Sequence, residues 1–140
     1  MKSAAQPIAA EFAFRLDAHS GVPVYRQLID QVQAAVATGT LRIGQQLPTV
    51  RRVAVDLTIN PNTVSRAYRE MEIRRILDTQ QGTGTFVAEQ QVESSPARRR
   101  QQLSQLTTEF VSRAGSAGFT VGDLVDALRQ LSPEVPSKRR

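Results

Sequence analysis

The sequence predicts a mainly α-helical protein with one small β hairpin, in which a compact domain precedes a pair of further helices. Apolar residues recur at helical spacing in five stretches, and a Gly-Thr-Gly turn at 82–84 separates two short strand-like stretches. An aromatic content of 5% and a hydrophobic content of 40% favour helices over a β-sandwich. We expect a disordered segment at 1–10, a folded domain at 11–89, a two-helix region at 90–132 and a flexible tail at 133–140.

Composition narrows the possible classes of function. The 140 residues carry a net charge of +5, which favours a polyanionic partner, and the absence of cysteine fits a reducing cytoplasm. No apolar run approaches the ~18 residues of a membrane span, and no apolar leader follows Met1. The single histidine, His19, falls in a predicted turn, and the carboxylates are scattered. We therefore expect a cytoplasmic protein that is not an enzyme, binds no metal or cofactor and has no membrane partner.

The folded domain is expected to begin with a short strand and a helix. Phe12, Phe14 and Leu16 alternate with less apolar residues, which is typical of a half-buried strand. After a turn at 20–23, one apolar stripe predicts a helix near 24–38. The stripe consists of Tyr25, Leu28, Ile29, Val32 and Val36.

Two shorter helices are predicted next, near 49–57 and 61–74, with a tight turn between them. Thr49 is a typical N-cap for the first helix, and Asn60 followed by Pro61 is a typical start for the second. Two helices joined in this way are typical of a helix-turn-helix, whose second helix enters the major groove of DNA.

The second helix of this pair has a polar, cationic ridge. Asn62, Arg66 and Arg69 fall on the outer face, flanked by Ser65 and opposite an apolar face. Asparagine can make two hydrogen bonds with adenine, and arginine can make two with guanine. The ridge therefore predicts a DNA-reading surface, and an ordinary solvated helix face is the alternative interpretation.

A hairpin is predicted directly after the helix pair, with strands near 76–80 and 85–88. Gly82 and Gly84 permit positive φ at its turn and leave backbone amides uncovered. In this position a hairpin can act as a wing whose tip lies against DNA phosphates or the minor groove. An ordinary surface turn is the alternative.

Six motifs in this order make the chain resemble the GntR family of bacterial transcription regulators. They cover the chain from about residue 12 to residue 88. The motifs are PVYRQL at 23–28, GTL at 39–41, GQQLPTVR at 44–51, NPNTV at 60–64, AY at 67–68 and GTGTFV at 82–87. The resemblance implies a winged helix-turn-helix that binds an operator as a dimer and usually represses. The short tail and the NPNTV start resemble the YtrA-type branch.

The resemblance also implies which residues contact DNA. The helix near 49–57 contributes Arg51. The turn, the helix near 61–74 and the wing tip contribute Asn60, Asn62, Thr63, Ser65, Arg66, Gly82, Thr83 and Gly84. The chain departs from the family's pattern at two positions. Arg75 stands where a glycine usually ends the recognition helix, so the family's pattern does not predict how this helix ends. Gln81 stands where a basic residue is common, so the wing lacks a positive charge that would strengthen a contact with phosphate.

The last part of the chain predicts a short two-helix dimerisation arm. Two apolar stripes flank a break at 115–118, and Thr120 is placed to cap the second helix. These stripes exceed what two helices can bury alone, so we expect them to form a homodimer; folding back on the first domain is the alternative. The expected dimerisation residues are Leu103, Leu106, Phe110, Leu124, Val125 and Leu128. Some 45 residues leave no room for a large effector domain, and the sequence does not identify a small-molecule effector.

Taken together, these features predict a sequence-specific regulator of transcription, with double-stranded operator DNA as its partner. We expect a repressor that binds a palindromic operator as a homodimer and is nucleoid-associated when bound. Non-specific nucleoid packaging, or a winged-helix module for protein–protein assembly, is the alternative. Asn62 and Arg66 favour sequence reading, because a ridge made only of lysine or of apolar residues would fit the alternatives better.

Overall fold

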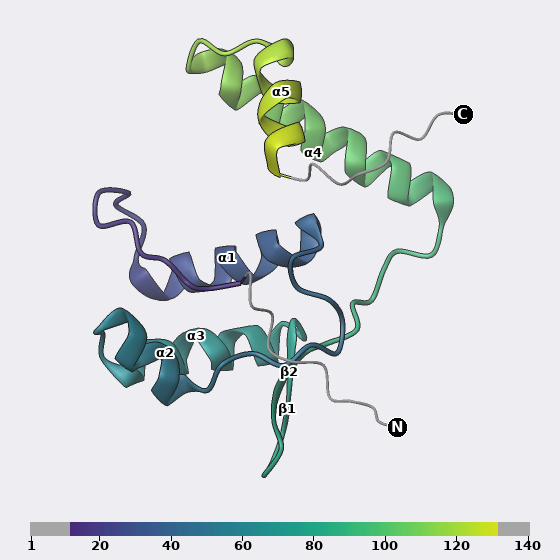
Figure 1. The fold of residues 1–140 in the computed structure, drawn as a ribbon. Helices are drawn as coiled ribbons and strands as arrows, with labels where there is room; N and C mark the ends of the chain where they lie inside the picture. Colours follow the sequence, from purple (N-terminus) through teal and green to yellow (C-terminus); the bar gives the residue numbers. More distant parts are fainter. Residues whose placement is uncertain (1–11, 132–140) are drawn as a thin grey trace. The chain divides into compact units, whose positions relative to one another are not determined.

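The computed structural model describes residues 12–131, and Figure 1 shows the order of the helices and strands. The chain divides into two compact units, residues 1–90 and 91–140. The predicted fold class is confirmed, because the described residues form five helices and one two-stranded antiparallel sheet. The predicted disordered segment at 1–10 and flexible tail at 133–140 lie outside the described residues.

The first unit is built on three helices, α1 (Val24–Thr38), α2 (Val50–Leu57) and α3 (Pro61–Ile73). Each ends within one residue of its predicted bounds, and each buries one apolar stripe in a common core. Gly39 ends α1 with a φ of 84°, a left-handed conformation that glycine adopts without steric cost. The core residues on these helices with no exposed surface are Leu28, Ile29, Val32, Val64, Ala67 and Met71.

The wing consists of β1 (Leu77–Gln80) and β2 (Gly84–Val87), which pair antiparallel. Leu77 lies opposite Val87 in the register, and both side chains are buried in the core. The chain leading to α2 runs along the other edge of β2. There the amide of Leu47 donates to the carbonyl oxygen of Thr85 at 2.8 Å, and the amide of Val87 donates to that of Gln45 at 2.9 Å. These bonds fix the wing to the helix-turn-helix.

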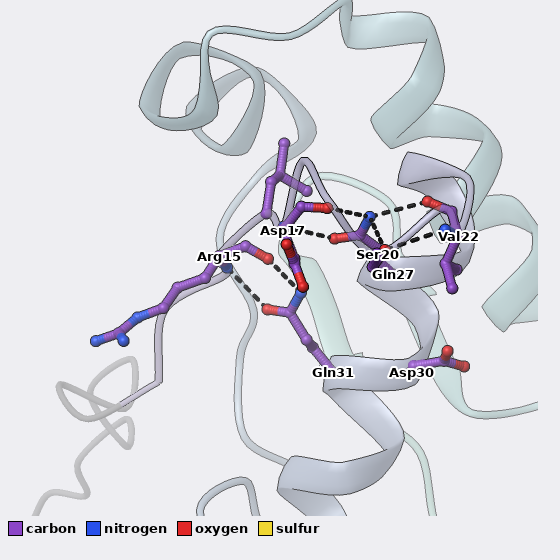
Figure 2. Close-up of a pocket in the computed structure, with 8 residues that line it drawn as sticks. Arg15, Asp17, Ser20, Val22, Gln27, Asp30 and Gln31 are labelled. Carbon is purple, nitrogen blue, oxygen red and sulfur yellow. Dashed lines mark hydrogen bonds between the residues drawn. The ribbon is translucent and has the colours of Figure 1, made fainter.

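The strand predicted at residues 12–16 is wrong. The alternation is present, since Phe14 is buried and Phe12 and Leu16 are partly buried, but the segment pairs with no other strand among the described residues. It lies against α1, whose own backbone groups are used within the helix. Side-chain amides replace a strand partner, as Figure 2 shows: Gln31 accepts from the amide of Arg15 at 2.8 Å and donates to the carbonyl oxygen of the same residue.

The second unit is a pair of helices, α4 (Pro96–Ser116) and α5 (Val121–Leu131). The predicted cap of α5 is confirmed, because Thr120 Oγ1 accepts from the amide of Asp123 at 3.1 Å. The Asp123 carboxylate in turn accepts from the amide of Thr120 at 2.9 Å, and these hydrogen bonds lower the pKa of Asp123. Within residues 12–131, no helix combines the length and apolarity that crossing a membrane requires.

Candidate DNA interface

The start of α3 is defined by side-chain caps on both sides of a tight turn. Thr49 Oγ1 accepts from the amide of Arg52 at 3.1 Å and begins α2. Thr58 ends α2 in the left-handed conformation, with a φ of 56°. Asn60 Oδ1 then accepts from the amide of Asn62 at 2.8 Å, with Pro61 at the first helical position. The predicted caps at Thr49 and Asn60 are confirmed, and together they set the angle at which α3 leaves the turn.

The predicted ridge of α3 lies on the surface of the first unit. Asn62, Arg66 and Arg69 are exposed, whereas Thr63 and Ser65 at the flanks are partly buried. The opposite face is fully packed, with Val64, Ala67, Tyr68 and Met71 in the core. The helix therefore presents its polar side chains on a base that cannot rotate without opening the core.

Tyr68 fixes α3 to the chain that precedes α2. Its hydroxyl donates to the carbonyl oxygen of Pro48 at 2.6 Å. Burial raises the pKa of Tyr68 above its ordinary value, so the hydroxyl stays protonated as a donor. This bond stabilises the position of the ridge without using any ridge residue.

The arginines on α2 and α3 differ in whether a nearby carboxylate neutralises their charge. Arg52 pairs with Asp56 at 3.1 Å, and Arg74 pairs with Glu70 at 2.9 Å, each one helical turn apart. By contrast, Arg51 on α2 and Arg69 on α3 have no ion pair with any carboxylate in the described part of the chain. Both are exposed, so their charges are available to a polyanion.

Arg66 has a partner that the sequence did not suggest. Its guanidinium carbon lies 3.8 Å from the centroid of the Tyr25 ring, which belongs to α1. The apolar stripe predicts Tyr25 on the core side of α1, and its side chain packs against the core there but is only partly buried. The periodicity of one helix cannot reveal this contact, because it depends on how α1 packs against α3.

The wing tip is formed by the turn from Gln80 to Thr83, where the amide of Thr83 donates to the carbonyl oxygen of Gln80 at 2.9 Å. Gly82 has a φ of 78°, and both Gly82 and Thr83 are exposed. Gly84 is partly buried, and a Cβ there would lie 2.4 Å from the side-chain nitrogen of Gln46. Gly82 and Thr83 thus form the uncovered tip, whereas Gly84 allows the wing to approach Gln46.

The two departures from the family's pattern have different structural outcomes. Arg75 has a φ of 62°, so the chain makes a left-handed turn after α3 although the residue is not glycine. The amide of Ile76 donates to the carbonyl oxygen of Met71 at 2.8 Å and closes that turn. Gln81 is exposed at the wing and adds no charge to it.

A shallow depression of about 490 Å³ lies between α1 and the residues that precede it (Figure 2). Its volume matches that of a ligand pocket. However, the Gln27 amide accepts from the amide of Asp17 at 2.9 Å and donates to the carbonyl oxygen of Val22 at 2.9 Å. Gln31 is engaged with Arg15 in the same way. Since both amides hold the preceding segment against α1, we assign no ligand to this depression.

Comparison with known proteins agrees with this geometry. The sequence profile described as "Bacterial regulatory proteins, gntR family" matches residues 24–87. The chain is 32% identical to the HTH-type transcriptional repressor YtrA of Bacillus subtilis over 130 residues, which cover 90% of this chain and 97% of that protein. It also resembles the structure of a transcriptional antiterminator from Listeria monocytogenes, with a TM-score of 0.61, 28% identity and coverage of 85% and 89% of the two chains. YtrA from Sulfolobus acidocaldarius, a GntR-family transcription factor, gives a TM-score of 0.54 and 25% identity over 71% and 97%.

Proposed function

The chain belongs to the GntR family of bacterial regulatory proteins and is a DNA-binding regulator of transcription, and we propose that it represses by binding a palindromic operator as a homodimer. The observation that carries the proposal is the exposed ridge of Asn62, Arg66 and Arg69 on a helix whose opposite face is packed in the core. The relative from Bacillus subtilis is called a repressor, and this supports the direction of regulation.

Within the operator, α3 is the reading element. Asn62 and Arg66 have the hydrogen-bonding groups that recognise adenine and guanine edges in the major groove. The remaining candidate residues position the domain on the backbone, because arginine cations and the polar groups of side chains and main chain bind phosphate and sugar. These are Arg51, Asn60, Thr63, Ser65, Arg69, Gly82, Thr83 and Gly84.

The arm is the dimerisation element. Leu103 and Leu106 on α4 are 65% and 63% exposed, and Phe110 is 47% exposed. On α5, Val125 and Leu128 are 39% and 50% exposed, and Leu124 is partly buried beside them. Large apolar side chains that cluster on an exposed surface mark interaction sites. A second copy of the arm would cover them and join two reading helices, as a palindrome requires.

The remaining parts of the proposal concern what the protein does not do and where it acts. It is not an enzyme, since its relatives are regulators of transcription and its exposed polar groups suit binding to DNA. It works in the bacterial cytoplasm and on the nucleoid when bound to its operator.

A binding experiment with the full chain tests the proposal. Fluorescence anisotropy should detect binding to DNA from the region upstream of its own gene, about 10³-fold tighter than to unrelated DNA. Footprinting should protect an inverted repeat with half-sites about one helical turn apart, ~34 Å. Equal affinity for both DNAs would favour non-specific packaging instead. Protection of a single half-site by a monomer would contradict the homodimer.

Substitutions on α3 separate reading from general attraction. Asn62→Ala or Arg66→Ala should weaken operator binding by about 1–3 kcal/mol and relax base preference at one position of each half-site. Arg74→Ala is the matched control for Arg66→Ala. It also removes an arginine, at the end of the same helix, but Arg74 is already paired with Glu70. If Arg66→Ala affected operator and unrelated DNA equally, Arg66 would contact only the backbone.

A further inference from the structure

The side chain of Arg66 rests on an aromatic ring that belongs to another helix. Tyr25 is the second residue of α1, and its partly buried ring packs against the core of the first unit. The guanidinium carbon of Arg66 lies 3.8 Å from the centroid of that ring. Arg66 nevertheless counts among the exposed residues. The ring therefore supports the side chain without removing it from solvent.

Stacking and hydrogen bonding use different parts of a guanidinium group. An aromatic ring contacts its flat face, whereas its five N–H donors point outward in the plane of the group. Recognition of guanine uses two of these donors, along one edge. Tyr25 can therefore stay stacked on Arg66 while the edge of Arg66 engages DNA.

A free arginine loses much conformational freedom when it binds. Ordering such a side chain opposes association, and this opposition falls when the side chain is already held in place. Arg51 and Arg69, the other exposed arginines of the candidate interface, have no ion-pair partner among the described residues. Arg66 differs from them because α1 limits where its side chain can lie.

We propose that Tyr25 is a positioning residue for DNA recognition, which holds Arg66 on α3 so that its edge faces the base it reads. The inference rests on the proposed function, since it assumes that Arg66 reads a base of the operator. It adds α1 to the elements that determine specificity, although the ring of Tyr25 makes no contact with DNA in this role.

A double-mutant cycle in the full-length protein tests the inference. Tyr25→Leu keeps an apolar side chain but removes the ring, and it should weaken operator binding about threefold to tenfold. Arg66→Ala alone should weaken binding on the order of 10–100-fold. In the Arg66→Ala background, Tyr25→Leu should change affinity by less than about twofold, because nothing remains for the ring to position. Tyr25→Phe keeps the ring and should bind like the wild type.

Base preference gives a readout that a merely structural role would not change. Selection from a randomised operator should show that Tyr25→Leu relaxes preference at the position that Arg66→Ala relaxes, and at no other position. Thermal unfolding of each variant checks that the first unit remains folded. In the free protein, the Nε–H proton of Arg66 should show an NMR ring-current shift that persists in Tyr25→Phe and disappears in Tyr25→Leu.

The contrary outcomes can be told apart. An equal loss of affinity for Tyr25→Leu with and without Arg66 would overturn the positioning role and leave the reading role of Arg66 intact. Tighter operator binding by Tyr25→Leu would mean that the stack holds Arg66 away from DNA, which also overturns the inference. If Arg66→Ala bound the operator like the wild type, the assignment of Arg66 as a reader would fail, and the inference would fail with it.

Discussion

The two units of the chain treat their apolar side chains in opposite ways. In the first unit, Leu28, Ile29, Val32, Val64 and Met71 are completely buried, and residues from every helix and both strands join one core. In the second unit, Ala114 is the only hydrophobic residue buried within the described range, whereas α4 and α5 expose leucines, valines and a phenylalanine. The first unit therefore has the buried core that independent folding requires, whereas the second unit exposes apolar surface of the kind that marks interaction sites.

Salt should reveal which unit holds DNA. Since the unpaired arginines of the interface lie in the first unit, operator binding should release several counterions from each DNA-binding domain. We expect the affinity of the full-length dimer to fall by about 10³-fold between roughly 50 and 200 mM salt. Anisotropy titrations at several salt concentrations give the slope. Residues 1–90 on a half-site should show about half that slope. If the affinity of residues 1–90 did not depend on salt, the phosphate contacts would lie outside the first unit.

Core and arm should respond differently to the same substitution. Leu28→Ala should destabilise the first unit by about 2–5 kcal/mol, because it leaves a cavity in a fully packed core. Leu106→Ala removes a side chain that is 63% exposed, and it should leave the unfolding of the first unit unchanged while weakening the dimer. Urea unfolding and analytical ultracentrifugation measure the two effects. A loss of first-unit stability in Leu106→Ala would mean that the arm packs on that unit.

Removal of the arm should separate folding from dimerisation. A chain that ends at Gln90 retains all elements of the first unit and should stay folded. It should sediment as a monomer and bind the full operator about 10²-fold more weakly, since the second module loses its high effective concentration. A truncated protein that remained dimeric and bound undiminished would show that the winged domains form the dimer themselves.

The smallest expected effect concerns the turn between α3 and the wing. Arg75 holds a φ of 62°, which is unfavourable for any residue with a Cβ. Arg75→Gly should relieve this strain and stabilise the first unit by about 0.5–1 kcal/mol, measured as a rise in thermal midpoint. Arg74→Gly, at a negative φ of −80°, is the matched control and should destabilise. A destabilising Arg75→Gly would mean that the arginine side chain makes contacts that outweigh the strain.

Local patterns were sufficient to predict most of the first unit. Thr49 and Asn60 are capping residues in the sequence, and their caps bond to the backbone as expected. The apolar stripes predicted α1, α2 and α3 because helical periodicity depends only on residues a few positions apart. The surface position of the α3 ridge follows from the same pattern.

Features that depend on packing between elements could not be predicted in this way. Alternation at Phe12, Phe14 and Leu16 indicated an extended, half-buried segment, but it does not specify whether a strand or a helix lies beside it. Here a helix lies beside the segment, and the side-chain amide of Gln31 on that helix forms hydrogen bonds with the backbone of Arg15, 16 positions away. The contact between Tyr25 and Arg66 is likewise set by the packing of α1 on α3. No local signal marks either pair.

The pairing of β2 with the chain before α2 has a consequence for the order of folding. Gln46 donates to the carbonyl oxygen of Thr83 across 37 positions of sequence, and the bonds at Leu47 and Val87 span similar intervals. Such non-local contacts form slowly, because a long loop must close before they contribute. Each helix relies on local hydrogen bonds within itself and should form early, whereas the wing can dock on the chain before α2 only after these long loops close. A newly made chain should therefore form α3 before the wing docks, and docking of the wing should complete the candidate DNA interface.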